Sequence, residues 1–223
     1  MTYFRYNILP SGEVYYKTHL TTAKLENRRN IRKLEQVAQE WNTLAEERKQ
    51  AAFSSWMLPL DVKSLAEDSE LLTYIIKKEL HKHHRKTKVY ISYDDNKKIQ
   101  GIAIACIRKD KKGCNELKDL ATHPQNVAIF SNDTPVRGVG TSLVVTVAKD
   151  VLMRKKGCKS LHLEAVNSAV PFYQKLGFTI DKKKPLHENV VYMVLKKEAM
   201  KELIRKNEDF IDIEKKEPKV KSS

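Results

Sequence analysis

The sequence predicts an α/β fold in which helices flank a mixed, mainly antiparallel sheet. Runs rich in β-branched and aromatic residues, at about 89–93, 99–107 and 116–122, are separated by short turns and indicate antiparallel strands. A glycine turn then leads into an apolar helical pattern and a further β-run at 161–166. Strand, helix and strand in this order require a right-handed crossover between two parallel strands. The length of 223 residues suits one well-cored domain.

The N-terminal part is expected to form two strands and a long helix. Residues 3–20 alternate apolar and polar side chains around a turn at 10–12, which indicates a hairpin. A helix over about 22–56 follows, and the apolar residues that share one of its faces are Ile31, Leu34, Ala38, Trp41 and Ala45. Pro59 is expected to end it. Packing on the sheet or on a second subunit would explain this face equally well, so a dimer stays open.

A second helix is expected from a cap at Ser69, and its shared apolar face comprises Leu72, Ile75, Ile76 and Leu80. The helix ends in the basic run 81–86, which contains three histidines. We expect no metal there, because no acidic or thiol ligand lies close in sequence. Contact with phosphate or nucleic acid is the favoured alternative.

The C-terminal half follows a long segment at 123–136. We expect a helix from the glycine turn to about Lys155, a short helix at 169–176, strands near 178–181 and 190–195, and a terminal helix after Lys196. The sequence thus predicts a single domain over 1–200, with residues 201–223 as the end of a helix and a charged tail that cannot form a core.

Composition limits the compartment and the partners. No apolar run is long enough to span a bilayer, and the N-terminus lacks the pattern of a secretory signal, so we expect a cytoplasmic protein without a membrane partner. Three scattered cysteines favour reduced thiols. The formal charge of +14 favours anionic partners, namely a phosphorylated cofactor, nucleic acid or an acidic protein face.

The glycine turn at 137–142, Arg-Gly-Val-Gly-Thr-Ser, is the strongest candidate for a binding site. A helix N-terminus offers backbone N–H groups without internal partners and a partial positive charge, and both suit an anion. Gly138 and Gly140 would let the backbone close on a pyrophosphate. A P-loop is disfavoured because no lysine precedes Thr141. A dinucleotide fingerprint is disfavoured because Leu143 stands where its third glycine belongs.

Three segments in order, LATHP at 120–124, RGVG at 137–140 and AVPFYQKLGF at 169–178, resemble the signature segments of the GNAT N-acetyltransferase superfamily. The resemblance covers about 88–196. It implies a sheet whose two central parallel strands splay apart to hold acetyl-CoA, which leaves as CoA. It also implies roles in cofactor binding for the backbone of Leu120, Ala121 and Thr122, which would pair with the pantetheine arm.

The same resemblance implies further cofactor contacts. The N–H groups of Arg137, Gly138, Val139, Gly140, Thr141 and Ser142 would hold the pyrophosphate, and Asn167 would contact the amide-bearing arm. Two departures from the family pattern stand beside these roles. Pro135 occupies a position that usually holds Gln or Arg, and the loop before the turn is about eight residues longer than is common.

For catalysis, the resemblance implies that Tyr173 donates a proton to the departing thiolate. An ammonium must lose a proton before its nitrogen can attack, so a base is useful. Glu116 matches the position of the base in relatives that acetylate protein lysines, and Glu164 is the second choice. A relay of water molecules without a dedicated base is the remaining alternative.

The sequence therefore predicts an acetyl-CoA-dependent N-acetyltransferase that acts on a primary amine of a protein or other macromolecule. A free polycation would be repelled by a chain at +14 unless Glu116, Asp119 and Glu164 made the site locally acidic. Two alternatives are an aminoacyl-tRNA acetyltransferase and a non-catalytic module that binds acyl-CoA or a protein. The charged C-terminal tail also resembles export signals of bacterial type IV secretion effectors, although a tail without signalling function is the interpretation we favour.

Overall fold

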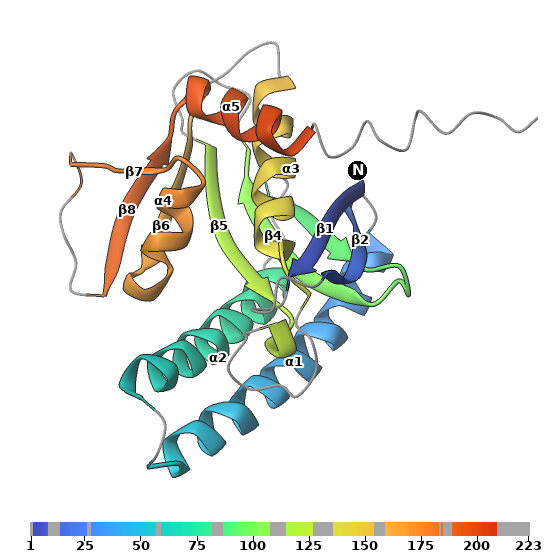
Figure 1. Ribbon diagram of the computed structural model, residues 1–223, viewed down its shortest axis with the longest axis vertical. Coiled ribbons are helices and arrows are strands. Elements are labelled where there is room, and N and C mark those ends of the chain that lie inside the picture. Colours follow the sequence, from blue (N-terminus) through green and yellow to red (C-terminus); the bar gives the residue numbers. More distant parts are fainter. Residues whose placement is uncertain are drawn as a thin grey trace, which may run out of the picture.

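A computed structural model describes residues 2–8, 14–25, 28–56, 59–81, 87–107, 115–126, 136–153, 159–182, 184 and 189–208. One mixed sheet carries helices on both faces (Figure 1), which confirms the predicted fold class. The strands are β1 (Thr2–Ile8), β2 (Val14–Leu25), β3 (Thr87–Tyr93), β4 (Ile99–Cys106), β5 (Asn115–Thr122), β6 (Leu161–Val166), β7 (Thr179–Ile180) and β8 (Val190–Leu195). The helices are α1 (Arg28–Ser54), α2 (Leu60–His81), α3 (Val139–Met153), α4 (Val170–Lys175) and α5 (Lys197–Glu208), with short 3-10 turns η1 (Pro124–Asn126) and η2 (Asn167–Ala169).

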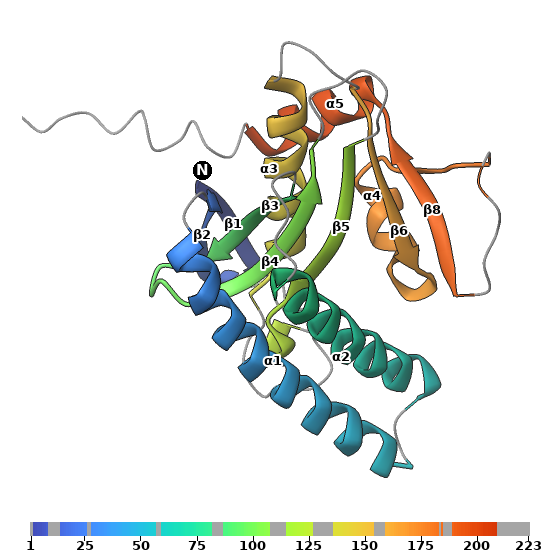
Figure 2. The ribbon, with the colours of Figure 1, turned by 180° about the vertical axis from the view of Figure 1, so that it is seen from behind.

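The strand order in the sheet is β1-β2-β3-β4-β5-β6-β8-β7. Each neighbouring pair is antiparallel except β5 and β6, which are parallel and joined in sequence by the crossover through α3. These two strands lie close together where they begin and diverge toward their C-terminal ends (Figures 1 and 2). The predicted splayed parallel pair is therefore present.

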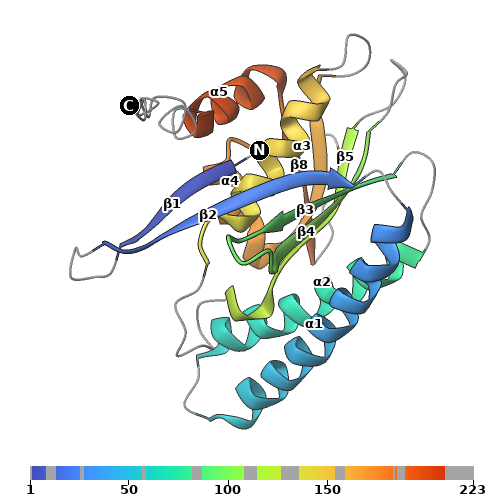
Figure 3. The ribbon, with the colours of Figure 1, turned by 90° about the vertical axis from the view of Figure 1, so that its right-hand side faces the viewer.

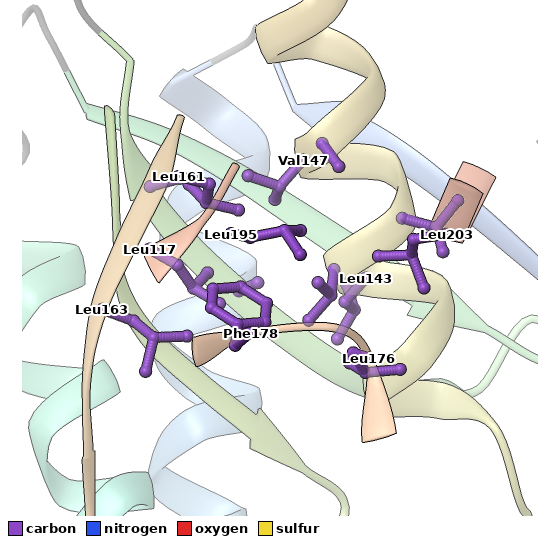
Figure 4. Packing of buried hydrophobic residues seen from close by; sticks show 14 of the residues in the cluster. Leu117, Leu143, Val147, Leu161, Leu163, Leu176, Phe178, Leu195 and Leu203 are labelled. Atoms are coloured by element: carbon purple, nitrogen blue, oxygen red, sulfur yellow. The ribbon is translucent and has the colours of Figure 1, made fainter. Parts of the chain in front are cut away.

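Two hydrophobic clusters hold the helices to the sheet. On one face, α1 and α2 pack through buried residues such as Leu34, Trp41 and Ile76 against Ile102 and Ile104 of β4 (Figure 3). On the other face, α3, α4 and α5 pack on the strands through a cluster that includes Leu117, Leu143, Val147, Leu161, Leu163, Leu176, Phe178, Leu195 and Leu203 (Figure 4). The gap between β5 and β6 thus has a helical layer on each side.

The predicted start of the long helix is wrong. Residues 22–25, which we assigned to a helix over 22–56, continue β2 and pair with β3 from Thr22↔Ser92 to Leu25↔Val89. The backbone hydrogen bonds of a neighbouring strand outweigh a helical pattern that a single sequence displays only weakly at its end. From Leu34 to Ala45 the predicted face is buried as expected.

The predicted start of the second helix is also wrong, because α2 begins nine residues before Ser69, at Leu60. The carbonyl of Pro59 accepts the N–H groups of Val62 and Lys63 and so opens the first turn of α2. Ser69 lies inside the helix, where its carbonyl accepts the Thr73 hydroxyl at 2.8 Å. The proline that was expected to end one helix therefore also begins the next one.

Among the described helices, none combines the length and the apolar composition that crossing a membrane requires. The predicted terminal helix is present as α5. The tail at 209–223, to which we assigned a charged terminus and a faint export signal, lies outside the described residues.

Candidate functional site

The gap between β5 and β6 is closed at one end and open at the other. At the closed end, Asn115 Nδ2 donates to the Ser160 carbonyl at 3.0 Å, and two pairs follow, Asn115↔Leu161 and Glu116↔His162. Beyond Glu116 the two strands share no further pairs among the described residues. Every second backbone N–H and C=O of β5 on this side consequently lacks a sheet partner, which leaves an edge that an extended ligand can pair with.

A pocket of about 150 Å³ lies at the open end of the gap. Its walls come from α2 through Leu65 and Leu72, from the end of β5 at 120–122, and from η2. The Ser168 hydroxyl of η2 donates to the Asp68 carboxylate of α2, and both residues line the pocket. This bond ties α2 to the chain that follows β6.

The glycine turn forms the N-terminus of α3. Gly138 has a φ of 84°, a left-handed conformation that favours glycine. The first intrahelical bond runs from the Ser142 N–H to the Gly138 carbonyl at 2.9 Å, so the N–H groups of Val139, Gly140 and Thr141 precede it and have no acceptor within the helix. Three such donors at one helix end have the geometry that suits an anion.

Ser142 does not belong to this set of donors, contrary to the prediction. Its N–H is committed to Gly138, and its buried hydroxyl donates to the Val139 carbonyl at 2.8 Å. The same hydroxyl lies 3.3 Å from the Ser92 hydroxyl of β3. Ser142 lies one turn beyond the start of α3, so both its N–H and its hydroxyl bond within the protein. We therefore remove it from the predicted pyrophosphate contacts.

Two glycines let α3 approach its neighbours closely. A Cβ on Gly140 would lie 3.0 Å from Phe172 Cζ and 3.7 Å from a Leu120 methyl, which brings the turn against α4 and β5. A Cβ on Gly101 of β4 would lie 2.4 Å from Val139 Cγ1. The start of α3 therefore rests directly on the sheet beside the gap.

A polar network ties the ends of the long loop before the turn. Asn126 Oδ1 accepts the Val136 N–H at 2.8 Å, and Asn126 Nδ2 donates to Gln100 Oε1 at 3.0 Å. Gln100 in turn donates to Asp94 at 2.7 Å. Residues 127–135, which include the unusual Pro135, lie outside the described residues. The network fixes the residue that enters the glycine turn, and Arg137 then lies exposed at its start.

Tyr173 is placed by α4 against the gap and is only 8% exposed. Its ring makes edge contacts with Phe172 and Phe178 at centroid distances of 5.0 and 5.5 Å. Burial, and then the nearby Asp119 carboxyl, raise the pKa of the Tyr173 phenol. The phenol therefore keeps its proton at neutral pH, as a proton donor must.

The predicted acidic and amide residues occupy different surroundings. Glu116 is half-buried at the last paired position of the gap. Glu164 is exposed on β6 and pairs across the sheet with Tyr192, whose hydroxyl bonds to it. Asn167 is exposed at the first position of η2. Thr122 ends β5 at the pocket, and Leu120, Ala121 and Thr122 line it as a group.

From the sequence we named Asp119 only as a possible source of local acidity and gave it no catalytic role. Its side chain is 9% exposed, and its Oδ2 atom is buried with no hydrogen-bond partner among the described residues. Burial, and then Glu79, raise the pKa of this carboxyl to about 6. The sequence did contain a signal, because Asp119 occupies a position of the strand between the apolar residues Leu117 and Ala121.

The part of the chain that the structure describes contains no group of three or more His, Cys, Asp or Glu side chains that could hold a metal ion. Residues 82–86 of the histidine-rich run lie outside that part.

Comparison with known proteins assigns the central segment to a family. Residues 85–180, which are 96 of the 223, match the family model described as the acetyltransferase (GNAT) domain. The chain contains a GNAT acetyltransferase domain. The predicted superfamily and the predicted class of enzyme, a GNAT-type N-acetyltransferase, are thereby confirmed at the level of the domain. No curated protein sequence matches the chain.

Many solved structures resemble the GNAT domain and its flanking elements. Mutant forms of the spermidine/spermine N-acetyltransferase SpeG from Vibrio cholerae share 12% identity, cover 82% of this chain and 96% of their own, and have a TM-score of 0.47. PaiA N-acetyltransferase from Thermoplasma acidophilum, solved in complex with coenzyme A, shares 15% identity over 79% of this chain and 98% of its own, with a TM-score of 0.46. Tetrahymena GCN5 shares 20% identity over 61% and 84%, with a TM-score of 0.44.

The matched GNAT segment runs from just before β3 to the end of β7. It includes every predicted site residue from Glu116 to Tyr173. It leaves out α2, which supplies Leu65, Asp68 and Leu72 to the pocket. One wall of the pocket thus comes from a part of the chain that the family model does not describe.

Proposed function

We propose that the chain is an acetyl-CoA-dependent N-acetyltransferase that transfers an acetyl group directly to a primary amine of a protein or other macromolecule. The observation that carries this proposal is the divergence of β5 and β6 after two pairs, beside the N-terminus of α3. GNAT acetyltransferases use acetyl-CoA, whose polar pantetheine arm carries a pyrophosphate. An unpaired strand edge suits the arm, and the N-terminus of a helix nearby suits the pyrophosphate.

The residues present fit this cofactor. At Gly140 a Cβ would lie only 3.0 Å from the ring of Phe172, so a side chain here would press on that ring, whereas glycine presents bare backbone. We assign the pyrophosphate to the N–H groups of Val139, Gly140 and Thr141, together with exposed Arg137 and the left-handed Gly138. The edge at 120–122 would pair with the pantetheine arm, and Asn167 would contact its amides. When bound, the cofactor supplies an acetyl thioester.

Tyr173 is the proposed proton donor to the leaving sulfur. Its phenol is protonated at neutral pH because burial raises its pKa. Phe172 of the same helix lies beside Gly140 of the glycine turn, and the Asp119 carboxyl of β5 acts electrostatically on the phenol. A donor that is fixed by two aromatic neighbours loses little freedom when it acts.

The acceptor is proposed to enter from the α2 side. The pocket has apolar walls at Leu65, Leu72 and Leu120, which suit an aliphatic stem, and carries the Asp68 carboxylate at its mouth. Further carboxyl groups lie beside β5. Glu79 and Glu116 both raise the pKa of Asp119, which shows that these two acidic side chains lie close to Asp119 and that the three add negative charge there. A cationic amine is therefore attracted locally even though the whole chain carries a formal charge of +14.

The test is release of CoA thiol from acetyl-CoA in the presence of lysine-containing peptides, polyamines, aminoglycosides and aminoacyl-tRNA, with mass spectrometry of each acceptor. We expect peptides to gain one acetyl group. Efficient acetylation of polyamines or aminoglycosides alone would refute the macromolecular acceptor. Acetylation of aminoacyl-tRNA with a steep dependence on salt would favour the tRNA alternative. Tight acetyl-CoA binding without thiol release for any amine would favour a non-catalytic module.

A further inference from the structure

A β-bulge determines where Asp119 points. Ile104 of β4 pairs with Asp119, and the next residue, Ala105, pairs with Leu117, so Lys118 is an extra residue without a partner in β4. A bulge reverses which face the following side chains occupy. Leu117 packs on the α3 side of the sheet, whereas Ala121 packs on the α1 and α2 side. Asp119 is two residues before Ala121 and opposite Ile104, so it faces α2 as well.

This direction places Asp119 at the opening of the gap. Glu116 is the last residue of β5 that pairs with β6, and Asp119 follows it by three positions. Asp119 also comes immediately before the segment 120–122 that lines the pocket. Alternate residues of a strand are about 7 Å apart, so the backbone of Asp119 lies one such step from Ala121 in the pocket wall. The Tyr173 phenol interacts electrostatically with the same carboxyl from the α4 side.

The surroundings give the Asp119 carboxyl no structural partner. Its Oδ2 atom has no hydrogen bond among the described residues. The charged groups that act on it are Glu79 of α2 and Glu116 and Lys118 of its own strand, and Lys118 lies 4.0 Å from Glu79. Two of these three neighbours are acidic, so they disfavour its ionised form. A buried carboxylate with an unused acceptor is costly unless a ligand completes it.

We propose that Asp119, rather than Glu116 or Glu164, is the general base that takes a proton from the acceptor ammonium. The proposal rests on the proposed function. Its basis is the buried, unpartnered Oδ2 atom at the opening of the gap and the bulge that aims it toward α2. An ammonium would give Oδ2 the hydrogen bond that it lacks in the free protein. Glu164, by contrast, is exposed and bonded to Tyr192, and Glu116 lies where the two strands are still paired.

The step balances in protons and electrons. The ammonium loses one proton to Asp119 Oδ2, and the freed lone pair forms the N–C bond to the acetyl carbonyl. The C–S bond breaks and its electron pair stays on sulfur. The second proton leaves the nitrogen as the amide forms, one proton reaches the sulfur through Tyr173, and Asp119 returns the other to water. One ammonium and one thioester thus give one amide, one thiol and one released proton.

A base must be ionised to accept a proton, and burial raises the pKa of Asp119 to about 6. A pKa near the working pH is what efficient general bases have. The plot of log kcat against pH should therefore rise with unit slope up to about pH 6 and then level off. Glu79, Lys118 and Glu116 are the groups whose charges would shift that midpoint.

The experiment compares Asp119→Asn, Glu116→Gln and Glu198→Gln with the unchanged chain on its best amine acceptor. Glu198→Gln is the matched control, because it removes a carboxyl from α5 on the far side of the sheet. We expect Asp119→Asn to lower kcat by about 100-fold or more, the usual contribution of a general base, and to abolish the rising limb near pH 6. Acetyl-CoA affinity, measured by calorimetry, should change less than about twofold, and the other two variants should keep the limb.

Asp119→Glu serves as the conservative variant and should restore a rising limb with a changed midpoint. Full activity and an unchanged pH profile in Asp119→Asn would overturn the assignment, and so would loss of the limb in Glu116→Gln. If the unchanged chain binds acetyl-CoA but releases no thiol with any amine, the proposed function and the base assignment both fail. If the unchanged chain turns over and Asp119→Asn keeps the same activity and pH profile, the base assignment alone fails.

Discussion

Replacing Asp119 by asparagine should stabilise the fold at neutral pH while it removes activity. The native state raises the pKa of this carboxyl from the ordinary 3.8 to about 6, chiefly through burial. Between those two values the native chain still holds a proton that the unfolded chain has released, so the free energy of unfolding falls as the pH rises. Below about pH 4 both states are protonated and the penalty is absent. Above about pH 6 it is complete.

The size of the penalty follows from the same two values. Each pKa unit corresponds to about 1.4 kcal/mol, so ionising Asp119 in the folded chain costs about 3 kcal/mol at neutral pH. Asparagine cannot ionise and avoids this cost, although its amide has packing and hydrogen-bonding consequences of its own. Those consequences do not depend on pH. The change with pH in the difference between the two chains therefore isolates the charge.

The assay is denaturation by urea of both chains at several values between pH 4 and 7.5. As the pH rises across this range, the free energy of unfolding of the variant should increase by about 3 kcal/mol relative to that of the unchanged chain. For a chain of this size this corresponds to roughly 6–12 °C in Tm. Glu198→Gln should show no such dependence, since that carboxyl is exposed. The reasoning would be refuted if the difference in the free energy of unfolding between Asp119→Asn and the unchanged chain did not vary with pH. That result would mean that Asp119 ionises normally in the folded chain.

Three further outcomes are expected. Tyr173→Phe should slow transfer by about 100-fold with nearly unchanged acetyl-CoA affinity, and an equal loss of both would contradict the donor role. Gly101→Ala should cost about 1–3 kcal/mol of stability through overpacking, because the new methyl would displace Val139 at the start of α3. The same displacement should weaken acetyl-CoA binding, and an unchanged denaturation midpoint and Kd would argue against this. Asn126→Ala should raise KM for acetyl-CoA and leave kcat unchanged, since it frees the Val136 N–H that precedes the turn; a lower kcat at constant KM would point to another role.

The centre of the fold was accessible from the sequence because local signals and tertiary contacts agree there. The middle of β4 is buried on both faces, and β3, β5 and β6 alternate between more and less buried positions, so the composition of these strands reflects their positions directly. The apolar face of α3 is buried as well. The N-terminal elements were harder to predict. Residues 21–25 become a strand only because β3 offers them partners, and the role of Pro59 in starting α2 depends on hydrogen bonds that periodicity does not register.

The candidate site could be predicted for its backbone and less well for its side chains. The glycine turn follows from composition, since Gly138 adopts a left-handed conformation and a Cβ on Gly140 would press on the ring of Phe172. Ser142 was misassigned because its position in the helix, one turn beyond the free N–H groups, depends on where α3 begins. Asp119 was named only for its acidity and not as a base, because the bulge at Lys118, which turns it toward α2, leaves no mark in the sequence.

The central claim is that acetyl-CoA lies in the gap between β5 and β6 with its pyrophosphate on the N-terminus of α3. Hydrogen–deuterium exchange of the chain with and without acetyl-CoA tests it most directly. The N–H groups of the first turn of α3, and every second one along the edge at 120–122, have no helix or sheet acceptor. We predict that acetyl-CoA slows exchange in peptides covering 120–122 and 137–141 and leaves α5 unchanged. Binding without protection at either segment, or protection confined to α1 and α2, would contradict the account.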